Sequence, residues 1–184
     1  MIFREGTTLY HGSYLPVEMP DLAQCRSGKD FGRGFYLTTD YDQAVSFVRL
    51  SIRKAVFDKR VPESCSKGYV SDYVVGSTVG LECLEFPYAD AEWLHCVVAH
   101  RKQVGAATAK WDRFDTIEGK IANDNTNVVI NAYMNGVYGE IGSQSAVSTA
   151  IGLLEPENLK NQVCLRTANA LAVIPFTGST EVRL

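Results

Sequence analysis

The sequence predicts one α+β domain, in which short strands and helices are mixed along the chain. The 184 residues, of which 46% are hydrophobic and 21% charged, have the size and composition of a single globular domain with a substantial core. Segments rich in β-branched and aromatic residues are separated by segments with helical periodicity. Neither an internal repeat nor a linker interrupts them, so we expect one domain to cover residues 1–184.

The first elements are expected to be two strands followed by a helix. Residues 7–10 are prone to form a strand, and residues 34–38 form a second, aromatic-rich strand. Asp40 is then well placed to cap a helix over 42–53, where apolar residues recur at helical spacing.

The remainder of the chain alternates in the same way. A stretch with Pro, Ser and Gly at 58–68 predicts a surface excursion. The pattern then predicts strands at 69–75, 79–86, 114–121, 162–166 and 181–184, and helices at 88–103, 127–134, 144–154 and 168–174.

Composition argues against several classes of function. The formal net charge of −3 gives no overall basic field, so a nucleic-acid partner is not expected. Five cysteines without a C-x-x-C pair indicate reduced thiols, and we expect no metal site. The N-terminus does not resemble a signal peptide, and no apolar run approaches the ~18 residues of a membrane span. We therefore expect a cytoplasmic protein with no membrane partner, although an effector secreted by a signal-independent route would have the same pattern.

Two segments taken together carry the chemical signal: Leu9-Tyr-His-Gly-Ser13 and Asp30-Phe-Gly-Arg-Gly-Phe-Tyr-Leu-Thr38. The pair resembles the NAD-binding signature of the diphtheria-toxin-like and poly(ADP-ribose)-polymerase-like ADP-ribosyltransferases. Two later stretches accompany it, Asp115-Thr-Ile-Glu-Gly-Lys-Ile-Ala-Asn-Asp124 and Asn161-Gln-Val-Cys-Leu165. With them, most of the chain resembles a bacterial domain family of unknown function placed in that superfamily.

The resemblance implies both a fold and an activity. The fold would be a split antiparallel β-core of two small sheets, with helices packed around an NAD cleft. The activity would be transfer of ADP-ribose from NAD to a macromolecular acceptor, expected to be a protein, as in bacterial effectors and toxins, which a partner protein can inhibit. Because nicotinamide leaves as a neutral molecule, the protein would mainly orient NAD and stabilise an oxocarbenium-like charge.

The resemblance also assigns roles to residues. His11 would donate a hydrogen bond to the adenosine-side ribose, and Gly12 would present its backbone N–H and C=O to the nicotinamide carboxamide. Tyr36 would stack on the nicotinamide ring, with the glycine loop turning close to the ligand and Arg33 at the pyrophosphate. The implied binding set is His11, Gly12, Ser13, Asp30, Gly32, Arg33, Gly34 and Tyr36.

These residues also have structural interpretations. His11 alone could make a structural hydrogen bond at a strand end. Tyr36 could fill the core, because strand alternation sends one of Phe35 and Tyr36 inward. Arg33 could be a solvated charge, and Asp30 could cap its loop. The joint order and spacing favour the NAD interpretation.

The third catalytic position departs from the pattern of the active enzymes. The transferases place a glutamate late in the chain, whereas this sequence offers Gln162, which can form the hydrogen bond but carries no charge. Loss of one such group costs on the order of 10²–10³ in rate. Glu118 or Glu140 could supply a carboxylate, or Gln162 could be a polar residue at a strand edge. The alternative function is therefore a catalytically degenerate module that binds NAD or ADP-ribose.

A third hypothesis, RNA 2′-phosphotransfer on the same fold, is disfavoured by the acidic charge balance and by the lack of that family's paired arginines. An ungapped count from Tyr36 puts Ala44 where polymerases use a serine on the nicotinamide amide. His95 and His100 are off the i,i+4 spacing of a metal pair, and Asp124 could cap a helix. One basic cluster forms either a solvated helix face or a site for an acidic partner: Arg49, Arg53, Lys54, Lys59 and Arg60.

Overall fold

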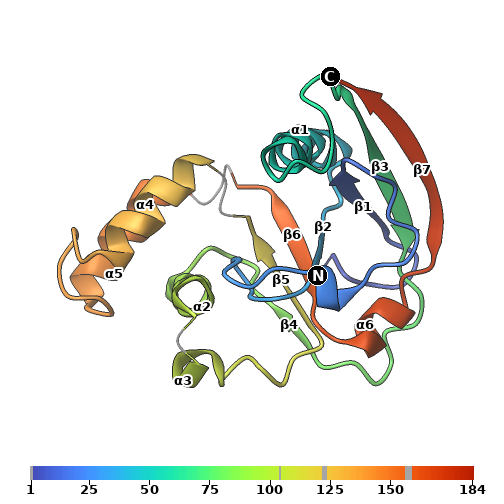
Figure 1. Cartoon of the computed structure of the whole chain (residues 1–184). Coiled ribbons are helices and arrows are strands. Elements are labelled where there is room, and N and C mark those ends of the chain that lie inside the picture. Colours follow the sequence, from blue (N-terminus) through green and yellow to red (C-terminus); the bar gives the residue numbers. More distant parts are fainter. Residues whose placement is uncertain (1, 104, 122–123, 156–158) are drawn as a thin grey trace.

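Two small β-sheets form the centre of the fold in the computed structural model, which describes residues 2–103, 105–121, 124–155 and 159–184 (Figure 1). The first sheet is antiparallel, in the order β1-β3-β7. The second has the order β2-β6-β5-β4, with β4 parallel to β5 and the other neighbours antiparallel. The strands are β1 (Thr8–Ser13), β2 (Phe35–Leu37), β3 (Lys67–Val74), β4 (Cys83–Glu85), β5 (Thr116–Lys120), β6 (Asn161–Leu165) and β7 (Phe176–Arg183). The predicted α+β class with two small sheets is confirmed, but the expected antiparallel core contains one parallel pair, β4 with β5.

Helices pack on the face of each sheet that is turned away from the other sheet. α1 packs on the first sheet, α2 shares an apolar cluster with the second, and α4 and α5 pack on each other and on α2, to one side of that sheet (Figure 1). A third apolar cluster, which includes Leu9, Phe35, Tyr73 and Leu165, fills the space between the sheets. The helices are α1 (Tyr41–Phe57), α2 (Ala91–Lys102), α3 (Gly105–Thr108), α4 (Asp124–Met134), α5 (Gln144–Leu154) and α6 (Ala168–Ala172), with a 3₁₀ helix at Leu22–Gln24.

Polar side chains cap the N-termini of several of these helices. Asp40 accepts a hydrogen bond from the Gln43 backbone N–H, as predicted for the start of α1. Asp90, Ser143 and Thr167 cap α2, α5 and α6 in the same way. The helix predicted over 144–154 has the bounds of α5.

The structure corrects some boundaries. The predicted strand over 79–86 shortens to Cys83–Glu85, and the strand expected at 181–184 begins instead at Phe176. After Phe176, residues 177–181 of β7 are polar or glycine, so this part of the strand lacks the apolar alternation that marks a half-buried strand. Leu50, on the apolar repeat of α1, is 44% exposed.

The described helices include none that is both long and apolar enough to cross a membrane. All five cysteines are free thiols, and Cys96 and Cys164 are buried. Within the described ranges, no group of three or more His, Cys, Asp or Glu side chains is arranged to hold a metal ion.

Candidate functional site

The two sheets meet at one pair of residues and then separate. Tyr10 on β1 and Thr38 beside β2 exchange both backbone hydrogen bonds, at 2.8 and 3.0 Å. In a regular antiparallel ladder the next hydrogen-bonded pair would be Gly12 with Tyr36. The pairing ends before that pair forms, and we call this end of the β1–β2 pairing the β1–β2 split.

His11 takes the hydrogen bond that the missing pair leaves open. Its Nδ1 donates to the Tyr36 carbonyl at 2.8 Å, and its ring lies 4.5 Å from the Phe35 ring. Burial lowers the pKa of His11 below the ordinary value of 6.5, although the hydrogen bond to Tyr36 opposes this. In the neutral ring with a proton on Nδ1, Nε2 carries a lone pair and acts as an acceptor.

Gly12 lies at the same end of the β1–β2 pairing. Alternation along β1 turns its N–H and C=O to the side on which Tyr10 bonds Thr38, away from β3. Within the described part of the chain, no hydrogen bond joins either group to β2. A Cβ at this position would lie 1.9 Å from the Ala44 carbonyl oxygen, so α1 can approach β1 only because residue 12 is glycine.

Tyr36 does not share a face with His11. Phe35 points into the cluster between the sheets, and Tyr36 packs on the opposite face against the cluster beneath α2. Its hydroxyl accepts from the Phe31 N–H at 2.9 Å and donates to the Gly32 carbonyl at 2.8 Å. Burial raises the pKa of Tyr36 well above its ordinary value. The ring is half-buried, and its hydroxyl fixes the glycine loop.

The two glycines of that loop are required by packing. Gly32 has a φ of +80°, and a Cβ there would lie 2.6 Å from Cδ2 of His100. A Cβ at Gly34 would lie 2.4 Å from Sγ of Cys164 and 2.6 Å from the Leu165 carbonyl oxygen. The motif therefore brings residues 30–34 against β6 and α2 at van der Waals distance.

Asp30, Arg101 and Gln162 form a buried cluster on the Tyr36 side of the second sheet. Arg101 donates from Nε and a terminal nitrogen to one oxygen of Asp30, at 2.9 and 2.5 Å. Gln162 donates from Nε2 to the other oxygen at 2.8 Å, and the Gln162 residue is only 5% exposed. The charges of Asp30 and Arg101 balance, so the cluster has no net charge.

The predicted residues therefore divide between two places. His11 and Gly12 lie at the split, whereas Asp30, Gly32, Gly34 and Gln162 lie with the Tyr36 side chain on the other face of β2. Sequence reasoning missed Arg101, because the helical pattern around it carried no sign of a carboxylate 71 residues away.

Ser13 and Arg33 make contacts within the chain. The Ser13 hydroxyl lies 3.4 Å from that of Ser51 on α1. Arg33 is exposed and donates to the Leu22 and Ala23 carbonyls, which fixes the 3₁₀ helix. Its guanidinium thus has a structural role at the position that the resemblance assigned to a pyrophosphate.

Two other acidic residues, Glu118 and Asp115, accept hydrogen bonds from neighbouring segments of the chain. Glu118 is buried on the opposite face of the second sheet, where it accepts from the Ile2 and Phe3 N–H groups, and burial raises its pKa. Asp115 accepts from the Glu82 N–H and the Thr167 hydroxyl.

The remaining candidate residues differ in exposure and in their place relative to helix ends. Glu140 is exposed in the loop between α4 and α5, and His95 is exposed whereas His100 is buried. Asn123 lies outside the described residues, and α4 begins at Asp124.

Comparison with known proteins gives a family without an assigned activity. No curated protein and no solved structure matches the chain. The family model for proteins of unknown function, DUF3990, matches residues 7–176, a range that contains the split, the glycine loop and β6. The chain belongs to this DUF3990 family.

Proposed function

We propose that this chain binds NAD at the β1–β2 split and is an ADP-ribosyltransferase-like protein. One observation carries the proposal. On the side of β1 that faces away from β3, the N–H and C=O of Gly12 form a donor and acceptor pair that makes no hydrogen bond to β2 among the described residues. A primary carboxamide such as that of nicotinamide has the complementary acceptor and donor, so it could pair with Gly12 as a neighbouring strand would.

His11 could contact the same ligand, but as a hydrogen-bond acceptor and not as the donor that the sequence resemblance implies. Because its Nδ1 donates to Tyr36, its Nε2 would accept a hydrogen bond from a ribose hydroxyl rather than donate one. A Tyr36 ring that faces the other side of β2 would not stack on a nicotinamide bound at Gly12, and Phe35 is the aromatic residue on the His11 side.

The transfer step would be cleavage of the bond between nicotinamide and ribose, with ADP-ribose passing to a protein acceptor. Its oxocarbenium-like transition state is stabilised by a nearby negative charge. Gln162 is neutral and bonded to Asp30, whose charge is balanced by Arg101. This arrangement favours the second candidate, a module that binds NAD or ADP-ribose without turnover.

Binding at the split can be tested with two matched ligands. In a ¹H,¹⁵N spectrum of the labelled protein, nicotinamide should produce saturable shifts of the Gly12 amide. Nicotinic acid, whose carboxylate lacks the amide donor, should not, and NAD should shift the same signal. Equal effects of both ligands, or shifts confined to residues far from β1, would contradict the proposal.

Turnover is tested separately by the release of nicotinamide from NAD. If NAD bound at Gly12 extends past β2 to Gln162, and the chain is a transferase weakened by this glutamine, Gln162→Glu should raise the rate by about 10²–10³. If it is a binding module, the substitution should leave release at the background rate while NAD still binds. Release by the wild-type protein at a rate above that of the His11→Phe variant would instead support the transferase.

A further inference from the structure

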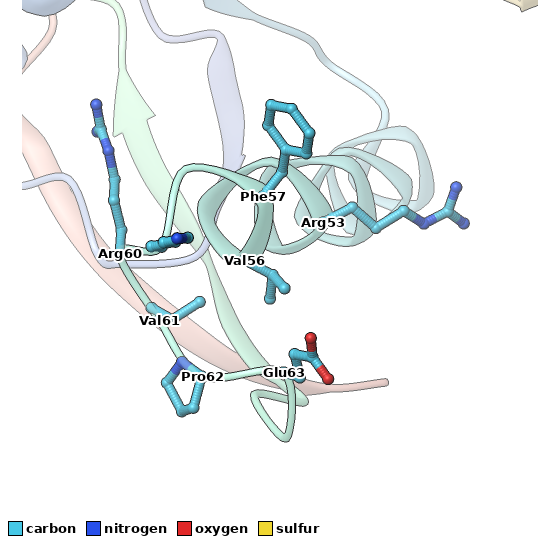
Figure 2. A pocket seen from close by; sticks show the side chains of 8 residues that line it. Arg53, Val56, Phe57, Arg60, Val61, Pro62 and Glu63 are labelled. Atoms are coloured by element: carbon cyan, nitrogen blue, oxygen red, sulfur yellow. The ribbon is translucent and has the colours of Figure 1, made fainter.

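The C-terminal end of α1 carries an open hollow with an apolar floor and a basic margin (Figure 2). Its volume is about 840 Å³, and the last turn of α1 and the segment after it form its walls. Val56 and Val61 line it from opposite walls, and Phe57 projects from the helix with 86% of its surface exposed. We call this the α1-end surface, which consists of Arg53, Val56, Phe57, Lys59, Arg60, Val61, Pro62 and Glu63.

Positive charge is concentrated here in a chain whose total is negative. Residues 49–60 hold five basic residues and one acid, whereas the chain has a net charge of −3. The acid, Asp58, pairs with Arg26 at 3.0 Å and with Arg60 at 4.0 Å. Among the described residues, Arg53 and Lys59 form no ion pair, so their charges are available.

The neighbouring Lys54 reflects this concentration of charge. Burial lowers the pKa of Lys54, and Arg26 and Lys29 lower it further, whereas Asp58 opposes them. The basic region therefore extends from the end of α1 to the loop that leads into the glycine motif.

The backbone at this helix end departs from the usual chemistry of helix termination. The Lys59 N–H bonds the Val56 carbonyl and the Arg60 N–H bonds the Ala55 carbonyl, which is the Schellman pattern. This motif favours glycine at the left-handed position and an apolar residue next, but here Lys59 has a φ of +56° and Arg60 follows. Two positions that would be more stable with other residues thus carry cations beside an exposed phenylalanine.

We propose that the α1-end surface binds an acidic segment of another protein, which inserts an apolar side chain between Val56 and Val61. The exposed Phe57 would supply the aromatic anchor, and Arg53, Lys59 and Arg60 would contact the carboxylates. Glu63 also lines the hollow, and its negative charge would repel a continuous phosphate backbone. A protein segment therefore fits the mixed charges better than a nucleic acid. This inference does not depend on NAD binding.

The test uses a fluorescein-labelled peptide with a central Leu–Phe pair flanked by glutamates. Its fluorescence anisotropy should show saturable binding to the whole chain that weakens between about 50 and about 300 mM salt. Peptides with glutamine in place of glutamate, or with serine in place of the Leu–Phe pair, should bind at least about fivefold more weakly.

Two variants and two controls locate the contact. Phe57→Ser should weaken binding about tenfold or more, and Lys59→Glu at least about fivefold. Val79→Ser and Arg183→Glu change an exposed apolar residue and an exposed cation elsewhere, and both should bind as the wild type does.

Several outcomes overturn the inference. These are no peptide binding, equal losses in the control variants, or tighter binding of an oligothymidylate than of the peptide. Sedimentation provides a further check, because self-association that Phe57→Ser abolishes would identify a second copy of the chain as the occupant instead.

Discussion

Arg101 holds the buried carboxylate of Asp30, so its removal should be costly. Both side chains are nearly inaccessible, at 14% and 10% exposed, and two nitrogens of Arg101 bond the same Asp30 oxygen. Breaking a buried ion pair costs about 3–5 kcal/mol because a charge is left uncompensated. Since Gln162 still donates to Asp30 and some water reaches the pair, we expect Arg101→Gln to lower the free energy of unfolding by about 2–4 kcal/mol.

A double-mutant cycle in urea measures the coupling. Asp30→Asn combined with Arg101→Gln removes both charges, so the double variant should be more stable than the sum of the single losses by about 1–3 kcal/mol. Lys102→Gln, at the exposed neighbouring residue, should change stability by less than about 0.5 kcal/mol. Losses that add to within about 0.5 kcal/mol, or a cost for Arg101→Gln below about 1 kcal/mol, would refute the argument.

Three further predictions concern packing, a helix end and pH. Gly34→Ala should lower the free energy of unfolding by more than about 2 kcal/mol, because its Cβ would lie 2.4 Å from Cys164 Sγ. Gly152→Ala, at a position of α5 with no atom near the new Cβ, should raise the free energy of unfolding by up to about 1 kcal/mol. If the denaturant midpoint of Gly34→Ala were instead the higher of the two, the structure around residue 34 would have to move enough to remove the close contact. Lys59→Gly should raise the free energy of unfolding by about 0.5–1 kcal/mol, because glycine adopts the left-handed conformation of residue 59 without strain, and it should weaken binding of the acidic peptide. An unchanged melting temperature would exclude backbone strain at this helix end. Burial lowers the pKa of His100 below 6.5, so the folded state binds its proton less readily than the unfolded state, and stability present above pH 6.5 is lost as pH falls. Melting temperatures at about pH 7.5 and about pH 5.5 should therefore differ less in His100→Gln than in the wild type or in His95→Gln, and equal differences in all three would count against this linkage.

The sequence predicted the elements whose signals are local. Asp40 marked the start of α1, and the apolar repeat at 144–154 matched α5. β7 was predicted too short because its residues 177–181 carry no apolar side chain, and α3 was missed because four residues are too few to show helical periodicity. Local propensity is thus sufficient where a cap or an apolar face defines the element.

The candidate site was less predictable because its geometry depends on distant pairings. Strand alternation predicts that Phe35 and Tyr36 face opposite sides of the sheet, but it does not predict which of them contacts His11. That contact depends on how the two strands are placed where the β1–β2 pairing ends. The contact between Asp30 and Gln162 spans 132 positions. His11 and Gly12 were predicted from their motif as candidate binding residues, whereas the packing of Gly12 on α1 could be seen only in the fold.

The imidazole of His11 completes the seam between the sheets in either protonation state. A second proton would go to Nε2, and the bond from Nδ1 to the Tyr36 carbonyl would persist. In acid the Nε2 of the ring would therefore change from an acceptor to a donor while the Nδ1 bond to β2 stays in place. Because burial lowers the pKa of His11, the unfolded state takes up this proton more readily than the folded state, so the same change in polarity would lower the stability of the fold as pH falls.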